Sequence, residues 1–275
     1  MNSYCGAVNV FVIAVAGVFL GWAFSKLQKH WWLLGYFLPA SLIVILAAAR
    51  WSNTLLFVPP FCWFTAGQLK FAVISFAVTT GLTTPLSRLP YKFEKWAVCV
   101  LMVVVVSWFA VLPFLTPVLI EDHLNGLHTI MDSQGNCFQS EDYTCGPAAA
   151  VTALRKLGLP AEEGEIAVLA RTNPISGTLP YCLYTAIQGR YGADGLKCCY
   201  RPFDSVAQLK GAGLILAVVR STLFSDHCVA VLSVADGTVT FADPVRGRRS
   251  MSYEQFGKVW RFAGIVLKRE SVDNI

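Results

Sequence analysis

Long apolar runs, separated by short basic or polar stretches, fill the first 120 residues and predict membrane-spanning helices. The third run is the least clear, because Pro59-Pro60 and Lys70 interrupt the apolar sequence around it. We expect one span there, preceded by an interfacial or re-entrant stretch over 54–67, and two short spans are the alternative. A helix crosses a bilayer in about 20 residues, which gives four predicted spans at 6–25, 31–49, 68–87 and 96–120.

The run at 6–25 also fits the apolar part of a signal peptide, but no Lys or Arg precedes it, so a retained span is expected. The basic residues between the runs predict the orientation, because cations gather in cytoplasmic loops. With the N-terminus outside, only Arg50 among the loop cations faces out. The cations on the cytoplasmic side are then Lys26, Lys29, Arg88, Lys92 and Lys95. The chain is therefore predicted to be an integral multi-pass membrane protein whose C-terminal half lies outside the cytoplasm.

After residue 120 the pattern becomes that of an α+β domain. Residues 121–136 form a polar linker, and 137–270 are the expected domain. The residue pattern predicts a first lobe with helices over about 147–157, 162–170 and 179–190. Short Val- and Ile-rich runs then predict an antiparallel sheet, and Asp236-Gly237 is a strong hairpin turn. The expected strands cover 198–201, 213–220, 227–235, 238–242 and 262–268.

Composition and charge support this division. The chain of 275 residues is 55% hydrophobic and only 14% charged, which is too apolar for an ordinary soluble protein. The net charge of +5 belongs to the first 120 residues, which hold seven basic and one acidic residue, against fifteen and sixteen in the remainder. Those cations flank apolar runs and form no basic stripe, so the lipid bilayer is an expected partner and nucleic acid is not.

Cys145 is the candidate nucleophile of the second half. Pro147 suits a first helical turn and Gly158 suits a helix end, so Cys145 is expected at a helix N-terminus. The unpaired N–H groups and the positive dipole end there favour a thiolate. Gln139, six residues upstream, can donate its amide N–H to an oxyanion if the loop folds back. A small buried packing residue is the alternative role for such a cysteine.

His227 and Asp243 complete a candidate catalytic set. His227 begins one predicted strand and Asp243 ends the next, so two antiparallel neighbours bring them to one edge of the sheet. His227 is then the general base for Cys145, and Asp243 orients the imidazole. Asp226 is the rival orienter, but adjacent strand residues point to opposite faces, which favours Asp243.

Together these residues resemble peptidase family C39, the papain-like double-glycine leader peptidases of peptide-exporting transporters. The resemblance covers about residues 132–270 and rests on Gln139, Cys145-Gly146-Pro147, His227 and Asp243-Pro244. It implies a cysteine peptidase that cleaves a peptide or precursor after a small-residue site. It also implies that the protein resides in a bacterial inner or cell membrane. The chain contains no GxxxxGK[ST] motif, so it is not itself a peptide-exporting ATPase. The resemblance therefore allows a separate peptide transporter as partner. Thr144 replaces the Asp common before the nucleophile, and Cys228 replaces a common aromatic residue.

Two other functions remain open: a catalytically silent C39-like domain that binds peptides or scaffolds, and an acyl transferase that uses the same triad. The full Gln, Cys, His and Asp set argues against the silent domain.

The remaining cysteines and histidines predict no metal site and no cofactor. Cys198-Cys199 lacks CxxC spacing, and His123 and His128 have no ligand pattern nearby. An extracytoplasmic domain allows a disulfide, and we expect Cys137 to pair with Cys182 or Cys198.

A basic segment follows Asp243 and is formed by Arg246, Arg248 and Arg249. It is predicted to be a turn that is either solvated or in contact with an acidic peptide or lipid head groups.

Overall fold

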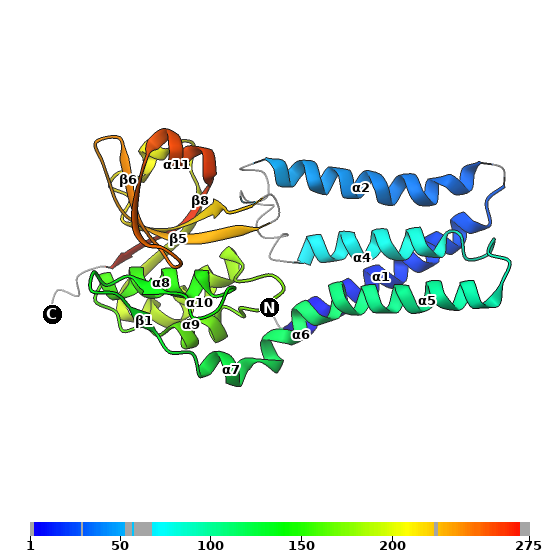
Figure 1. The fold of residues 1–275 in the computed structure, drawn as a ribbon, viewed down its shortest axis with the longest axis horizontal. Coiled ribbons are helices and arrows are strands. Elements are labelled where there is room, and N and C mark those ends of the chain that lie inside the picture. The colour runs from blue at the N-terminus through cyan, green and yellow to red at the C-terminus, as the bar shows by residue number, and fades with distance from the viewer. Residues whose placement is uncertain (1–2, 29, 53–56, 58–67, 223–224, 270–275) are drawn as a thin grey trace. The chain divides into compact units, whose positions relative to one another are not determined.

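The computed structural model of the chain describes residues 3–28, 30–52, 57, 68–222 and 225–269. The chain divides into two compact units, and Figure 1 shows their elements. The first unit comprises residues 1–51 and 67–118, and the second comprises 52–66 and 119–275. All described secondary-structure elements of the first unit are helices, and every described strand belongs to the second.

The first unit is built from apolar helices. Large apolar side chains such as Phe11, Phe37 and Val103 are exposed on them. Apolar residues on all sides of a helix are typical of a membrane span. The elements are α1 (Ser3–Ser25), the 3-10 helix η1 (Trp31–Leu33), α2 (Leu34–Trp51), α4 (Gln68–Thr83), α5 (Lys92–Val106), the π-helix η2 (Ser107–Val111) and α6 (Leu112–Leu119).

Helices α1 and α4 pack closely because glycines on α1 meet threonines on α4. A Cβ atom on Gly21 would lie 2.6 Å from the carbonyl oxygen of Thr80, so a larger residue there would push the helices apart. The Thr80 hydroxyl donates a hydrogen bond to the carbonyl of Gly17 at 3.2 Å. The buried Thr79 and Thr83 donate theirs to carbonyls one turn back on α4. Small residues at the contact and internally satisfied hydroxyls are the usual features of helix packing in lipid.

Two of the helical segments, Ala7–Ser25 and Trp31–Ala49, are long and apolar enough to cross a membrane. The predicted span 68–87 corresponds to α4, whose apolar part, Phe71–Thr83, is shorter than a crossing. The predicted span 96–120 falls in the run from α5 to α6, where η2 interrupts the α-helix. Four spans therefore remain a prediction. The interfacial stretch expected over 54–67 lies outside the described residues except for Phe57.

In the second unit, three main helices precede a sheet along the chain. Its helices and 3-10 helices are α7 (Glu121–Asn125), α8 (Cys145–Lys156), α9 (Glu163–Leu169), α10 (Pro180–Tyr191), η3 (Gly192–Asp194), η4 (Val206–Leu209) and α11 (Tyr253–Val259). Its strands are β1 (Ile130–Met131), β2 (Cys137–Phe138), β3 (Leu196–Pro202), β4 (Leu214–Arg220), β5 (Asp226–Ala235), β6 (Thr238–Asp243), β7 (Gly247–Ser252) and β8 (Trp260–Arg269).

Strands β3 to β8 form one antiparallel sheet in the order β3-β8-β4-β5-β6-β7. Strands β5 and β6 are a hairpin in which Ala235 lies opposite Thr238. Asp236 and Gly237 form its two-residue turn with positive φ values of 49° and 72°, as a type I′ turn requires. This hairpin brings the start of β5 and the end of β6 to the same edge of the sheet.

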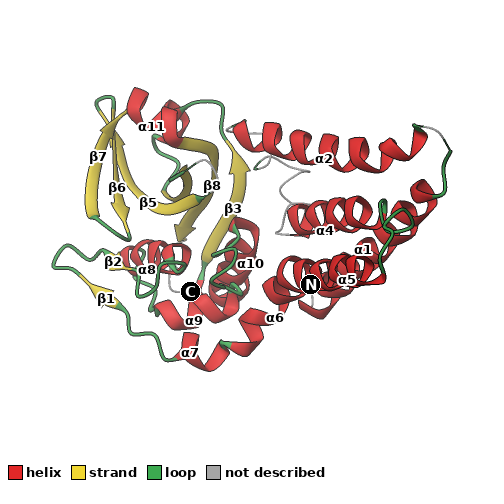
Figure 2. Ribbon diagram, turned by 45° about the vertical axis from the view of Figure 1, so that its right-hand side comes forward, coloured by secondary structure: helices red, strands yellow, loops and turns green. Residues whose placement is uncertain are grey.

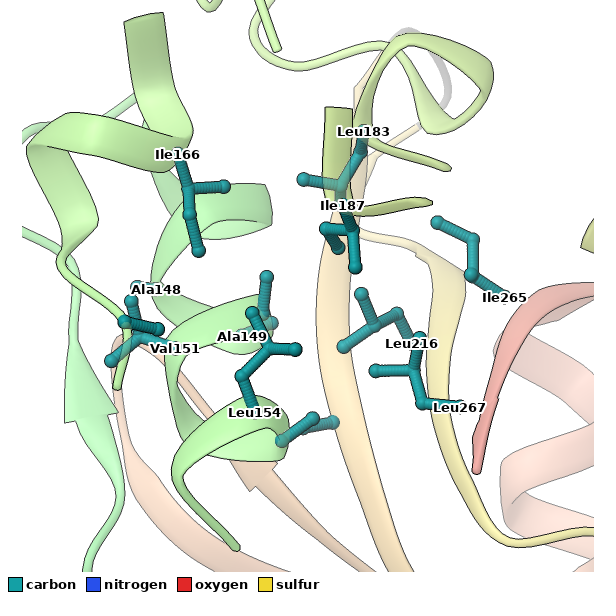
Figure 3. Close-up of a cluster of buried hydrophobic side chains, with 14 of the residues drawn as sticks. Ala148, Ala149, Val151, Leu154, Ile166, Leu183, Ile187, Leu216, Ile265 and Leu267 are labelled. Atoms are coloured by element: carbon teal, nitrogen blue, oxygen red, sulfur yellow. The ribbon is translucent and has the colours of Figure 1, made fainter. Parts of the chain in front are cut away.

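Helices cover both faces of this sheet (Figure 2). Because strand residues alternate, Ala230 of β5 joins the core on the α8 side, while Val229 and Val231 join the core on the α11 side. Burying one leucine such as Leu154 of α8 stabilises the fold by about 2 kcal/mol. Figure 3 shows the α8-side core, which includes Ala148, Ala149, Val151, Leu154, Ile166, Leu183, Ile187, Leu216, Ile265 and Leu267.

Three features differ from the sequence-based expectations. Residues 121–136, expected to be a polar linker, contain α7 and β1, and Leu124 of α7 is fully buried. Arg248 and Arg249 lie in strand β7 and not in a turn, which corrects that prediction. Helix α11 was not predicted from the sequence. Its N-terminus is a capping box in which the Ser252 hydroxyl accepts from Gln255 N, and Gln255 Oε1 accepts from Ser252 N.

Candidate active site

Cys145 is the first residue of α8, and its neighbours define the turn that presents it. Thr144 is fully buried. Its hydroxyl donates to the carbonyl of Glu141 at 3.0 Å and accepts from the N–H of Glu141 at 3.1 Å. At Gly146, a Cβ atom would lie 2.8 Å from Cβ of Thr178. The turn before Cys145 is thus pinned by Thr144, and the close approach after it requires a glycine.

His227 and Asp243 meet at the edge that the β5–β6 hairpin brings together. Nε2 of His227 lies 2.9 Å from Oδ1 of Asp243. The same carboxylate oxygen accepts the N–H of Val245 at 2.9 Å. The Cys145 side chain is near enough to the imidazole to help raise the pKa of His227. His227 is therefore hydrogen-bonded to Asp243 and is influenced electrostatically by Cys145.

The environment holds His227 and Asp243 in their charged forms. Burial lowers the pKa of His227, but the hydrogen bonds to Asp243 and Cys145 outweigh it and raise that pKa to about 9. Burial by itself raises the pKa of Asp243. The hydrogen bonds from His227 and Val245, with the charge of Arg246, nevertheless hold it below its ordinary value. An imidazolium beside a carboxylate is thus the stable form across neutral pH.

Gln139 lies close to the Asp243 end of this chain. Its backbone N–H donates to the carbonyl of Pro244 at 3.0 Å. Its side-chain Nε2 donates to the carbonyl of Glu141 at 3.0 Å, which uses one of the two amide hydrogens. Its Oε1 is buried and accepts no hydrogen bond from the described residues. The other amide hydrogen of Gln139 has no acceptor among the described residues.

Asp226 has a different partner. Nε and Nη2 of the fully buried Arg261 both lie 2.9 Å from its Oδ1. Asp226 lies opposite Arg220 and His227 lies opposite Val219 across β4 and β5. Asp226 and His227 are therefore adjacent on β5, but Asp226 binds Arg261 whereas His227 binds Asp243.

The predicted disulfide is wrong, because Cys137, Cys182 and Cys198 are free thiols. Cys137 and Cys198 are packing residues of the α8-side core. Burial raises the pKa of Cys137 and of Cys198 to about 12. It also raises the pKa of Cys182. Cys228 is a further thiol beside Cys145, and burial is the main reason that its pKa lies well above the ordinary value. Among the described residues, no group of three or more His, Cys, Asp or Glu side chains is placed to bind a metal.

A cavity of about 300 Å³ adjoins His227 and Asp243 on the α11 side of the sheet. Apolar side chains such as Val229, Phe241 and Phe256 form part of its wall, and Arg249 of β7 reaches it. Neither the cavity nor the position of Arg249 was anticipated. Alternation of side chains along β7 could have predicted that Arg249 faces the cavity, but the two adjacent arginines obscured the alternating pattern.

Two relatives match about half of the chain, and no family model matches it. An uncharacterized protein of Methanothermobacter marburgensis is 35% identical over 133 residues, which are 48% of this chain and 87% of that protein. An uncharacterized protein of Methanothermobacter thermautotrophicus is 33% identical over 132 residues, which are 48% of this chain and 86% of that protein.

Solved peptidase domains are similar to about the same share of the chain. One is a double glycine motif protease from an AMS/PCAT transporter in complex with the leader peptide. Its identity is 17% and its TM-score 0.41, over 48% of this chain and 89% of that one. Another is the peptidase domain of Streptococcus ComA, a bi-functional ABC transporter of a quorum sensing pathway. It has 18% identity and a TM-score of 0.42, over 52% of this chain and 100% of that one.

Proposed function

This chain belongs to the same family as the two Methanothermobacter proteins, and we propose that it is a membrane-anchored cysteine peptidase that acts through Cys145, His227 and Asp243. The observation that carries the proposal is the 2.9 Å contact between Nε2 of His227 and Oδ1 of Asp243, with Cys145 at the start of α8 near enough to help raise the pKa of His227. A nucleophile, a base and a group that orients the base are the parts that acyl transfer through a thioester requires.

In this mechanism His227 holds the proton that Cys145 has given up, as the imidazolium that its raised pKa favours, and Sγ of Cys145 attacks the carbonyl carbon of the scissile bond. The oxyanion is stabilised by the backbone N–H of Cys145 and by the remaining amide N–H of Gln139. His227 then gives its proton to the leaving amine as the C–N bond breaks. Water attacks the thioester with His227 as base, which releases a carboxylic acid and restores the thiol.

The substrate class follows from the resemblance of Gln139, Cys145-Gly146-Pro147, His227 and Asp243-Pro244 to peptidase family C39. We propose a peptide or precursor that is cut after small residues such as Gly-Gly, with a separate transporter as a partner. If an amine replaces water in the last step, the same site is an acyl transferase. The product distinguishes these reactions, because hydrolysis shortens the peptide and transfer joins it to another molecule.

Mild thiol labelling of the full-length protein across pH tests the activated Cys145–His227 pair. At about pH 6 an ordinary thiol, with a pKa of about 8.5, is almost entirely protonated and unreactive. We expect Cys145 to react there, and mass spectrometry of peptide fragments identifies the modified residue. Exposed Cys199 is the internal reference, because its reactivity reports access without a paired histidine.

His227→Ala is expected to remove the low-pH reactivity of Cys145 and to leave Cys199 unchanged. Equal labelling of Cys145 and Cys199 in the wild-type protein, with no effect of His227→Ala, would contradict the peptidase. A catalytically silent peptide-binding domain would then be the better account.

The membrane part of the proposal comprises four spans and an extracytoplasmic peptidase domain. It is supported by the two apolar helical segments Ala7–Ser25 and Trp31–Ala49 and by the distribution of basic residues. A reporter enzyme that folds only outside the cytoplasm, fused after Ile275, is expected to be active. The same reporter fused after Arg88 is expected to be inactive. The opposite pattern would reverse the orientation, and equal signals would exclude this span count.

A further inference from the structure

The cavity beside His227 and Asp243 is basic. Three arginines line it: Arg220 at the end of β4, Arg246 after β6, and Arg249 in β7. The guanidinium of Arg220 donates to the carbonyl of Lys258 at 3.2 Å. Within the described part of the chain, neither Arg246 nor Arg249 has a side-chain ion pair. Two cationic groups thus face this space without a bound carboxylate.

The nearby carboxylates are already engaged. Asp243 is hydrogen-bonded to His227, and Asp226 is bound by Arg261. Glu254 of α11 pairs with Lys258 at 2.6 Å. The cavity therefore carries net positive charge that the described side chains do not balance, and a ligand with a negative charge would balance it.

The remaining wall favours an ion pair over a hydrated ion. It includes the side chains of Val229, Phe241, Met251 and Phe256, and the rings of Phe241 and Phe256 lie 5.8 Å apart. An apolar wall lowers the local dielectric constant and strengthens the attraction between opposite charges. The planar fork of a guanidinium can bind both oxygens of a carboxylate.

We propose that this cavity binds a carboxylate of the peptide substrate close to the scissile bond. The inference rests on the proposed peptidase, because the proposed base His227 forms part of the cavity wall. Because His227 and Asp243 belong both to the cavity wall and to the proposed catalytic set, a group bound there belongs to a part of the peptide near the scissile bond. The carboxylate is either an acidic side chain or the C-terminus of the peptide.

Binding of matched peptides to full-length Cys145→Ala protein tests the inference without turnover. The first pair carries Glu or Gln beside a Gly-Gly sequence and has amidated ends. The second pair is neutral throughout and ends in a free carboxylate or an amide. We expect one acidic member to bind about tenfold or more tightly than its neutral partner, as a charge-assisted hydrogen bond allows. The pair that shows the preference identifies the source of the carboxylate.

Arg249→Met is expected to reduce that preference to about twofold or less, since one guanidinium–carboxylate bond is lost. Arg248→Met is the matched control: Arg248 is the adjacent residue of β7, is exposed, and does not line the cavity. It should keep the preference. Arg249→Glu should favour a peptide with Lys in place of Glu.

Equal binding of the acidic and neutral members, or no binding of either pair, would overturn the carboxylate site. So would equal effects of Arg248→Met and Arg249→Met. Labelling of wild-type Cys145 at about pH 6 requires no peptide and no arginine, so it decides the peptidase proposal separately. A reactive Cys145 without a carboxylate preference leaves a peptidase whose cavity has another role.

Discussion

Replacing Cys145 with alanine is expected to abolish peptide hydrolysis by removing the sulfur atom that forms the thioester in the proposed mechanism. In enzymes that use a nucleophile, base and orienting acid as one unit, loss of the nucleophile reduces turnover by about ten-thousandfold or more. Turnover of an internally quenched peptide measures the effect. Circular dichroism should show an unchanged fold, because Cys145 is only partly buried at the first position of α8.

Cys228→Ala is the matched control for this variant. Cys228 is also close to Cys145 and follows His227 directly, but its thiol is buried and its pKa is raised well above the ordinary value. It should therefore be a poor nucleophile. We expect Cys228→Ala to retain most of the activity. Hydrolysis that persists in Cys145→Ala and disappears in Cys228→Ala would show that the nucleophile is Cys228 and not Cys145.

Asp243→Asn is expected to reduce turnover by about a hundredfold to ten-thousandfold. The amide lacks the negative charge, and its N–H can donate to Nε2 of His227. This favours a neutral imidazole with its proton on Nδ1, the nitrogen that has to accept the proton of Cys145. The substitution keeps the shape of the side chain, so the loss reports the charge and the tautomer.

The same substitution should change the pH dependence in a defined direction. In the wild-type protein the hydrogen bonds to Asp243 and Cys145 outweigh burial and raise the pKa of His227 to about 9. The imidazolium of His227 has to protonate the leaving amine, so activity falls as pH rises through about 9. In Asp243→Asn this decline should move toward the ordinary histidine pKa of about 6.5. The rate profile and an NMR titration of His227 measure it.

Stability should follow the same shift. The folded-state pKa of His227 lies above its unfolded value, so the stabilisation is complete below about pH 6.5 and is lost as pH rises through about 9. Asp226→Asn is the contrasting variant, because it removes a carboxylate that binds Arg261 instead of His227. It should lower the free energy of unfolding and leave the pKa of His227 near 9. A pKa shift as large as that of Asp243→Asn would contradict separate roles for the two carboxylates.

Much of the local structure could be predicted from the chain because its signals are local. Pro147 and Gly158 bracket a helix that the structure places at Cys145–Lys156, and positive φ values at Asp236 and Gly237 make the expected hairpin turn. That hairpin predicts that His227 and Asp243 share an edge, and their 2.9 Å contact is consistent with it. The long apolar runs likewise indicated the two helical segments that can cross a membrane.

The expectations that differed depended on contacts between distant residues. Strand β7 is an edge strand with mostly polar side chains, so its alternation carried little signal, and pairing with β6 decides its conformation. Cys137 and Cys198 are packing residues because the α8-side core surrounds them, which cysteine counting does not reveal. Leu124 is buried although the segment around it is polar.

The sequence by itself determined the main helices α8 to α10, the hairpin of β5 and β6, the apolar helices and the residue types at the candidate site, because periodicity, caps and turn residues act over a few positions. Only the tertiary structure decided which arginine of β7 reaches the cavity and that Arg261 binds Asp226. Each of these depends on strand order and register, which join positions far apart in the chain. The proposed chemistry and its carboxylate site rest on those long-range contacts.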